Sequence, residues 1–160
     1  MELKILCAAR RNFQIGSFII QKVERMPFSH FAVLVDGFVY EAVWPKSKAS
    51  YFDLWLHDYR VVRYFDFSTE DECIIKKTRG FISRNNGVRF SILQILIIAL
   101  SYVISPLKYS ILNGKKKLIC SEYVARLLLE IFNKPFKKPF DCLSLRNVYR
   151  ACLQVEKGRK

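Results

Sequence analysis

The chain has 160 residues, of which 51% are hydrophobic and 14% aromatic. This composition excludes a disordered protein and predicts one domain, residues 1–160, that is long enough to bury a core. Its net charge of +13 points to anionic partners, such as a lipid surface, but no motif that reads RNA or DNA is present. We therefore expect no specific nucleic-acid binding.

The first half of the chain predicts strands around one helix. A first strand is predicted at residues 3–8. Apolar residues at 15, 18, 19 and 23 predict a helix from Ile15 to Glu24. Asp36-Gly37 between two apolar runs predicts a two-residue β-hairpin. A further strand is expected from Tyr59 to Phe67.

The second half predicts helices. They are expected at about 69–84, opened by Ser68 or Thr69, and then at 91–104, 120–133 and 143–153. This order predicts an α+β fold, in which a small antiparallel sheet or half-barrel is packed by helices.

The segment from Phe90 to Leu107 is almost continuously apolar. It is close to the shortest length that spans a bilayer, about 17 residues, and Pro106 would end the helix early. We favour a buried core helix. The alternative is an interfacial helix, with basic residues at both ends that suit an anionic membrane.

Five cysteines, at positions 7, 73, 120, 142 and 152, leave one thiol over after any pairing. The N-terminal apolar run is too short for a signal peptide, so we expect reduced thiols and a cytoplasmic location, with peripheral membrane contact as a possibility left open. We expect no cofactor and no metal, because His57 has no neighbour at a ligand spacing.

Two short stretches carry the candidate chemistry. Cys120 opens a predicted helix, where the positive end of the helix dipole favours a thiolate. His30 stands at the start of a predicted strand and is a candidate general base for that thiol. Together they predict a cysteine hydrolase or acyltransferase.

The hairpin adds a third residue. If Asp36-Gly37 forms the turn, Ala32 lies opposite Glu41, and His30 becomes a diagonal neighbour of Glu41 on the same face. A carboxylate there can fix the tautomer of the imidazole and stabilise the imidazolium. A register slip of one residue would place the two groups on opposite faces.

Other interpretations of these residues are open. A histidine in an apolar strand is usually structural, and a cysteine in an apolar helix usually serves packing. His57, followed by Asp58, is the main rival base. Glu41 favours a site, because a carboxylate buried in an apolar strand is costly without a partner.

The three residues resemble a known family, the circularly permuted papain-like hydrolases of the NlpC superfamily, which include YiiX-like proteins and lecithin–retinol acyltransferase-like enzymes. The resemblance rests on Ser29-His30 before an apolar run, Glu41 after an aromatic residue, and Cys120-Ser121-Glu122 at the start of an apolar helix. The opening strand, the helix before Ser29-His30 and the closing helix at Leu143–Tyr149 also fit, so the resemblance covers nearly the whole chain.

The resemblance implies that Cys120 is the nucleophile, His30 the general base and Glu41 the residue that orients His30. It also implies a peptide, amide or lipid-ester substrate and an acyl-enzyme intermediate. Many relatives carry Gly-x-x-Tyr-Asp before the nucleophile, whereas this chain has Gly87-Val88-Arg89-Phe90-Ser91. The acidic residue at position 41 favours the YiiX-like branch, since the acyltransferase branch tends to use a second histidine there.

A second hypothesis is a catalytically inactive basic protein, structural or interacting, such as a viral protein that keeps the fold and binds membrane or anionic partners. It would act in the host cytoplasm or the virion. The reactivity of the Cys120 thiol separates this hypothesis from an enzyme. The sequence leaves the oligomeric state open.

Overall fold

The computed structural model describes residues 1–92, 95, 117–140 and 143–159. Most of the predicted helix 91–104, and Cys142, lie outside the described residues. The elements follow one another as β1 (Leu3–Arg10), α1 (Ile15–Glu24), β2 (His30–Val35), β3 (Phe38–Glu41), β4 (Lys48–Tyr51), α2 (Phe52–Asp58), β5 (Tyr59–Asp66), α3 (Glu72–Asn85), β6 (Arg89–Phe90), β7 (Lys117–Leu118), α5 (Cys120–Phe132) and α6 (Leu145–Gly158).

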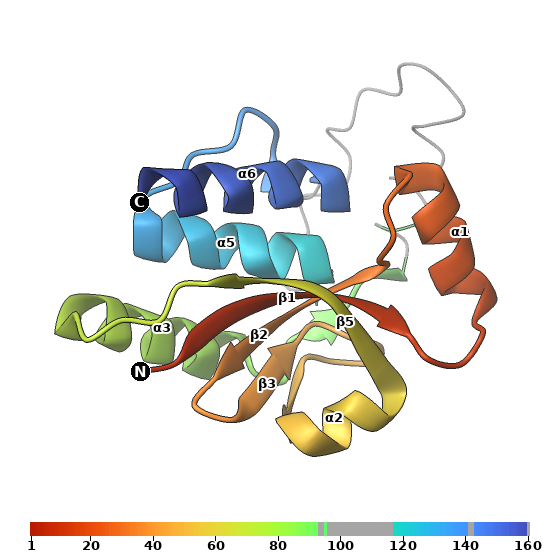
Figure 1. Ribbon diagram of the computed structural model, residues 1–160, viewed down its shortest axis with the longest axis horizontal. Helices are drawn as coiled ribbons and strands as arrows, with labels where there is room; N and C mark the ends of the chain where they lie inside the picture. Colours follow the sequence, from red (N-terminus) through yellow and green to blue (C-terminus); the bar gives the residue numbers. More distant parts are fainter. Residues whose placement is uncertain (93–94, 96–116, 141–142, 160) are drawn as a thin grey trace.

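The fold is α+β, as predicted. Five strands form an open antiparallel sheet in the order β4-β3-β2-β1-β5. In Figure 1, α5 and α6 lie on one side of the sheet and α2 on the other, while α1 lies at one end of the molecule. All six residues of β2 are buried, because this strand is central and covered on both faces.

The predicted hairpin is confirmed. Asp36 and Gly37 both have positive φ, 46° and 83°, as a two-residue turn of the primed type requires. Val35 pairs with Phe38, and the register continues to Val33 and Tyr40. Since side chains alternate along strands, this register directs His30 and Glu41 to the same face.

The boundaries of two predicted helices were wrong. Helix α3 begins at Glu72 and not near Thr69, because the Asp71 carboxylate caps it by accepting hydrogen bonds from the backbone N–H groups of Cys73 and Ile74. Helix α6 continues beyond Leu153 to Gly158 and begins after the N-cap Ser144.

Strand β4 and helix α2 were not predicted. Helix α2 covers seven residues, Phe52–Asp58, and carries His57 in its last turn. This helix covers the second face of the sheet, and the site depends on it.

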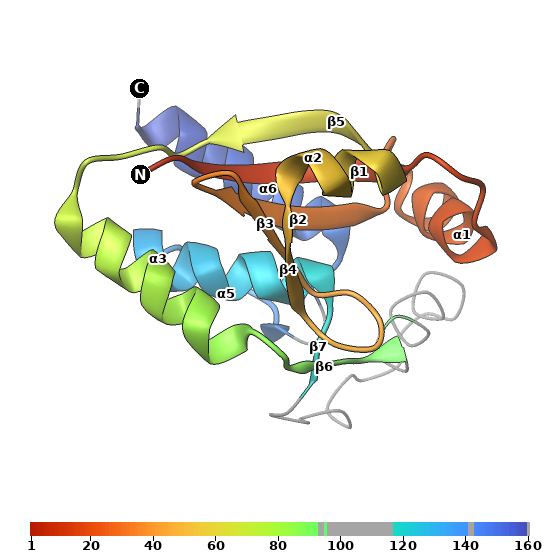
Figure 2. The same cartoon turned by 90° about the horizontal axis from the view of Figure 1, so that it is seen from below.

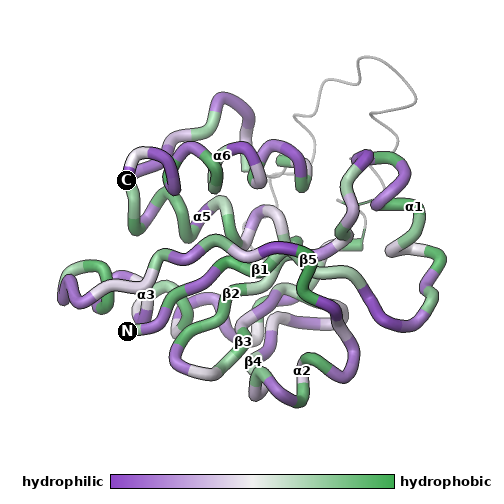
Figure 3. Tube along the Cα trace, in the orientation of Figure 1, coloured by the Kyte–Doolittle hydropathy of each residue, from purple (hydrophilic) through white to green (hydrophobic). Residues whose placement is uncertain are grey.

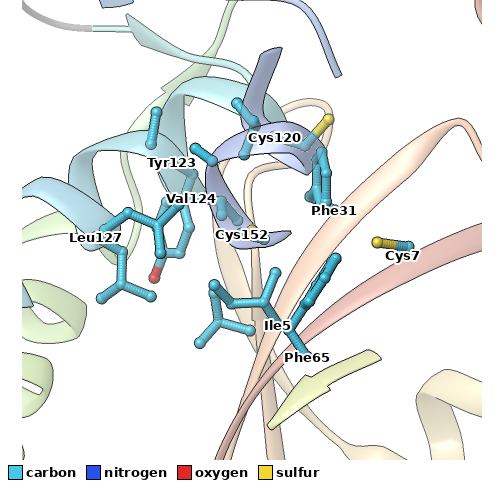
Figure 4. Close-up of a cluster of buried hydrophobic side chains, with 14 of the residues drawn as sticks. Ile5, Cys7, Phe31, Phe65, Cys120, Tyr123, Val124, Leu127 and Cys152 are labelled. Carbon is cyan, nitrogen blue, oxygen red and sulfur yellow. The ribbon is translucent and has the colours of Figure 1, made fainter. Parts of the chain in front are cut away.

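The core has two parts, one on each face of the sheet. The larger part packs α5 and α6 against residues such as Ile5, Phe31 and Phe65 (Figure 4). The smaller part packs Trp55 and Tyr59 against Leu6 and Leu34, among others.

Seen from below, α3 runs alongside α5, and the short parallel pair β6 and β7 lies near the start of α5 (Figure 2). The chain therefore reaches the first residue of α5 directly from a strand. Within the described part of the chain, no helix has the length and apolar character needed to cross a membrane.

Candidate active site

His30 and Glu41 meet as the register predicts. The imidazole Nε2 lies 2.7 Å from the carboxylate oxygen Oε2 of Glu41. The Glu41 side chain is fully buried, and the His30 side chain is only 11% exposed. Excluding water strengthens this contact and holds the ring in one orientation.

Cys120 lies on the other side of the same imidazole. The thiol lies close enough to the imidazole for hydrogen bonding and charge interaction between them to raise the pKa of His30. Cys120 is the first residue of α5, after the N-cap Ile119, whose apolar side chain cannot accept from the first-turn N–H groups. The structure thus brings Cys120, His30 and Glu41 together from α5, β2 and β3.

The surroundings favour a charged His30. Burial lowers the pKa of the imidazole, but hydrogen bonds to Cys120 and Glu41 outweigh it and raise the pKa from 6.5 to about 9. Burial raises the pKa of the Glu41 carboxyl. The interactions with His30, Trp55 and Lys48 outweigh burial and hold this pKa below its usual range. At neutral pH the pair is therefore an imidazolium and a carboxylate.

Two partners of Glu41 were missed by the sequence analysis. The indole N–H of Trp55 donates to Oε2 at 3.0 Å. The ammonium of Lys48 lies 3.6 Å from Oε1 of Glu41. Lys48 is also the residue of β4 that pairs directly with Glu41 of β3. The acid inside an apolar strand was a signal for such partners, since a buried carboxylate needs donors around it.

An aromatic stack supports His30 from the α2 side of the sheet. Tyr59 stacks on the imidazole with 5.2 Å between ring centroids, and Trp55 stacks on Tyr59 at 4.5 Å. The Arg10 guanidinium lies 4.4 Å from the centroid of the Tyr59 ring. Trp55 and Tyr59 stand four residues apart, a helical spacing that could have indicated a shared face.

A small apolar pocket of about 40 Å³ reaches Cys120. Its walls come from α1 through Ile20 and Val23, from the start of α5, and from Leu143 and Leu145 before and within α6. Space beside the sulfur is what an acyl group bound to a nucleophilic thiol requires.

The rival base does not join this site. His57 lies exposed on α2, beside Arg11, Asp53 and Leu56 in a separate shallow depression. Of the other described thiols, Cys7 and Cys152 are buried in the core and Cys73 is exposed. Among the described residues, no three histidine, cysteine, aspartate or glutamate side chains are grouped as a metal site.

Comparison with the models of known protein families and with curated protein sequences gives no match to this chain.

Proposed function

We propose that this protein is a cysteine hydrolase or acyltransferase, with Cys120 as nucleophile, His30 as general acid and base, and Glu41 as the residue that orients and charges His30. The observation that carries the proposal is the single imidazole that joins the Cys120 side chain to the buried Glu41 carboxylate. We further propose that the chain is a circularly permuted member of the papain-like NlpC superfamily, on the order of its residues and the α+β fold.

In the first step, the Cys120 sulfur, whose proton is held by His30, attacks the carbonyl carbon of an amide, ester or thioester, and the carbonyl electron pair moves to its oxygen. When this pair returns, the bond between the acyl carbon and the leaving group breaks. The backbone N–H of Cys120, at the start of α5, can donate to that oxyanion. The His30 imidazolium gives its proton to the leaving amine, alcohol or thiol, and an acyl-enzyme remains.

In the second step, neutral His30 takes a proton from water or from an acceptor, which attacks the acyl carbon. The C–S bond breaks and the sulfur of Cys120 leaves. Glu41 keeps its charge in both steps and stabilises the imidazolium whenever it forms. The apolar pocket at Cys120 supports a substrate whose acyl side is small and apolar, such as a peptide side chain or the start of a lipid acyl chain.

We also propose a reducing, cytoplasmic setting. The buried Cys7 and Cys152 and the exposed Cys73 are all free thiols, and a thiolate nucleophile needs a compartment that keeps it reduced.

The deciding experiment measures the alkylation rate of each cysteine by mass spectrometry between about pH 5 and pH 9. We expect Cys120 to react fast near about pH 6 in the wild type and at least about tenfold more slowly in His30→Ala. Cys73 serves as an internal reference for an exposed thiol. Burial raises the pKa of Cys7 to about 12, so this thiol should stay unlabelled.

His57→Ala is the matched control, because it removes the other histidine from an exposed helix position. It should leave the Cys120 rate unchanged. Slow labelling of Cys120 that does not respond to His30→Ala would overturn the proposal and support the inactive interaction protein.

A further inference from the structure

Helix α1 turns an apolar face towards solvent. Ile15, Phe18 and Ile19 follow a helical spacing and are 69%, 47% and 46% exposed. Phe13, just before the helix, is 78% exposed, and its ring lies 5.9 Å from that of Phe18. We call these four residues the α1 outer face. Figure 3 shows that the hydrophobic residues of α1 lie at the end of the molecule, away from the sheet.

The outer face is not needed for the core. The apolar contact of α1 with the rest of the protein is made by other residues, Ile20, which packs on the core, and Val23, which lines the pocket with it. A short helix that exposes apolar residues beyond those it packs has a second surface to cover.

The exposed charges of α1 and its C-cap are positive. Lys22 and Arg25 are exposed, and the Lys22 ammonium lies 5.5 Å from the centroid of the Phe18 ring. The acid of this region, Glu24, is 4% exposed and faces inward. From position 11 to position 29 the chain carries no other acidic residue.

We propose that the α1 outer face docks on an anionic lipid bilayer, with its apolar side chains in the interface and Lys22 and Arg25 at the headgroups. Apolar insertion and attraction of cations to anionic headgroups are the two contributions that hold interfacial helices. The net charge of +13 acts in the same direction at long range.

A second copy of the chain fits the α1 outer face less well than an anionic bilayer does. In a symmetric dimer the same surface meets itself, so Lys22 and Arg25 of one copy would approach the same cations of the other. An anionic bilayer covers the apolar residues and neutralises these charges together.

Docking would bring the site to the lipid. Because Ile20 and Val23 of the same helix line the pocket beside Cys120, a bilayer against the outer face would lie next to that pocket. The docking itself does not rest on the proposed catalysis, and its test uses no substrate.

The test is flotation of the full chain with vesicles of phosphatidylcholine, alone or mixed with phosphatidylserine. We expect binding to the mixed vesicles that weakens as salt rises from about 50 to about 300 mM. Ile15→Ser combined with Phe18→Ser should weaken binding at least about tenfold, because two apolar insertions are lost. Lys22→Gln combined with Arg25→Gln should remove most of the dependence on phosphatidylserine.

Leu54→Ser combined with Tyr64→Ser is the matched control, since both residues are exposed and apolar but lie on α2 and β5. This variant should bind as the wild type does. Wild-type chain that does not bind mixed vesicles, or equal loss in the control, would overturn the proposal. A wild-type dimer that the Ile15 and Phe18 substitutions convert to monomer would also overturn it, in favour of a second copy. The alkylation rate of Cys120 is measured without vesicles, so failure of docking and failure of catalysis remain distinguishable.

Discussion

Helices α1 and α5 line the same small pocket, yet they use apolar residues in opposite ways. In α5, Val124, Ala125, Leu127 and Leu128 are at most 1% exposed and pack on the sheet. In α1, Ile15, Phe18 and Ile19 also follow a helical spacing, but their side chains face solvent. Helix α5 positions Cys120, the proposed nucleophile, by burial, whereas α1 leaves an apolar face exposed.

The difference shows that apolar residues at a helical spacing predict an apolar helix face, but do not predict what that face packs against. Helix α5 lies over the middle of the sheet, where β2 is buried on both faces. Helix α1 lies beyond the ends of the strands, so only one of its sides meets the protein.

The largest expected effect is at the first residue of α5. Cys120→Ala should abolish formation of an acyl-enzyme with an activated thioester and lower turnover by at least about 10³-fold, since the nucleophile is lost. Intact-mass measurement of the acylated protein checks this. Cys73→Ser, at the exposed thiol on α3, should leave acylation unchanged. Acylation that persists in Cys120→Ala would place the nucleophile elsewhere.

The next effect concerns the buried side of α5. Leu128 is fully buried, so Leu128→Ala should lower the free energy of unfolding by about 2–5 kcal/mol through lost burial and the cavity left behind. Urea denaturation followed by circular dichroism measures the loss. A cost below about 1 kcal/mol would mean that α5 is not held by this core.

The charge on His30 links stability to pH. Because its pKa is raised from 6.5 in the unfolded chain to about 9, the protonated imidazole stabilises the fold fully below pH 6.5, and this contribution is lost as pH rises through about 9. Its size is on the order of 3 kcal/mol, at about 1.4 kcal/mol for each unit of pKa. Urea unfolding from about pH 6 to pH 10 should show this decline in the wild type.

Glu41→Gln should reduce the decline, because the neutral amide keeps the shape of the side chain but no longer stabilises the imidazolium, while the contribution of Cys120 to the raised pKa of His30 remains. Glu70→Gln is the control, at an exposed acid outside the site. Equal slopes in the wild type and Glu41→Gln would show that Glu41 does not set the charge of His30.

The smallest effect on folding should come from the α1 outer face. Ile15→Ser should change the free energy of unfolding by no more than about 0.5 kcal/mol, since the side chain is already 69% exposed. Parallel urea curves for this variant and Leu128→Ala compare the two helices directly. A large loss would show that the outer face is packed against the protein.

Much of the fold could be predicted from local signals. The bounds of α1 were predicted to the residue, and Asp36-Gly37 defined the hairpin because a two-residue turn with positive φ is a local property. The strand at Lys48–Tyr51 and the helix at Phe52–Asp58 escaped prediction, because both are short and their identity depends on pairing with β3 and packing on the sheet.

The candidate site divides in the same way. The proximity of His30 and Glu41 could be predicted, because the two-residue turn sets the register of the hairpin and side chains alternate along each strand. Trp55, Tyr59 and Lys48 could not be assigned to the site, because their approach depends on where α2 and β4 lie.

The sequence by itself determined the residue types, the apolar spacings and the register of one hairpin, because these depend on neighbours along the chain. Only the tertiary structure decided that Cys120 shares an imidazole with Glu41, that an indole and an ammonium flank the buried carboxylate, and that the apolar face of α1 points outward. These features depend on contacts between segments far apart in sequence, and burial and electrostatic interaction act at short distances in space regardless of that separation.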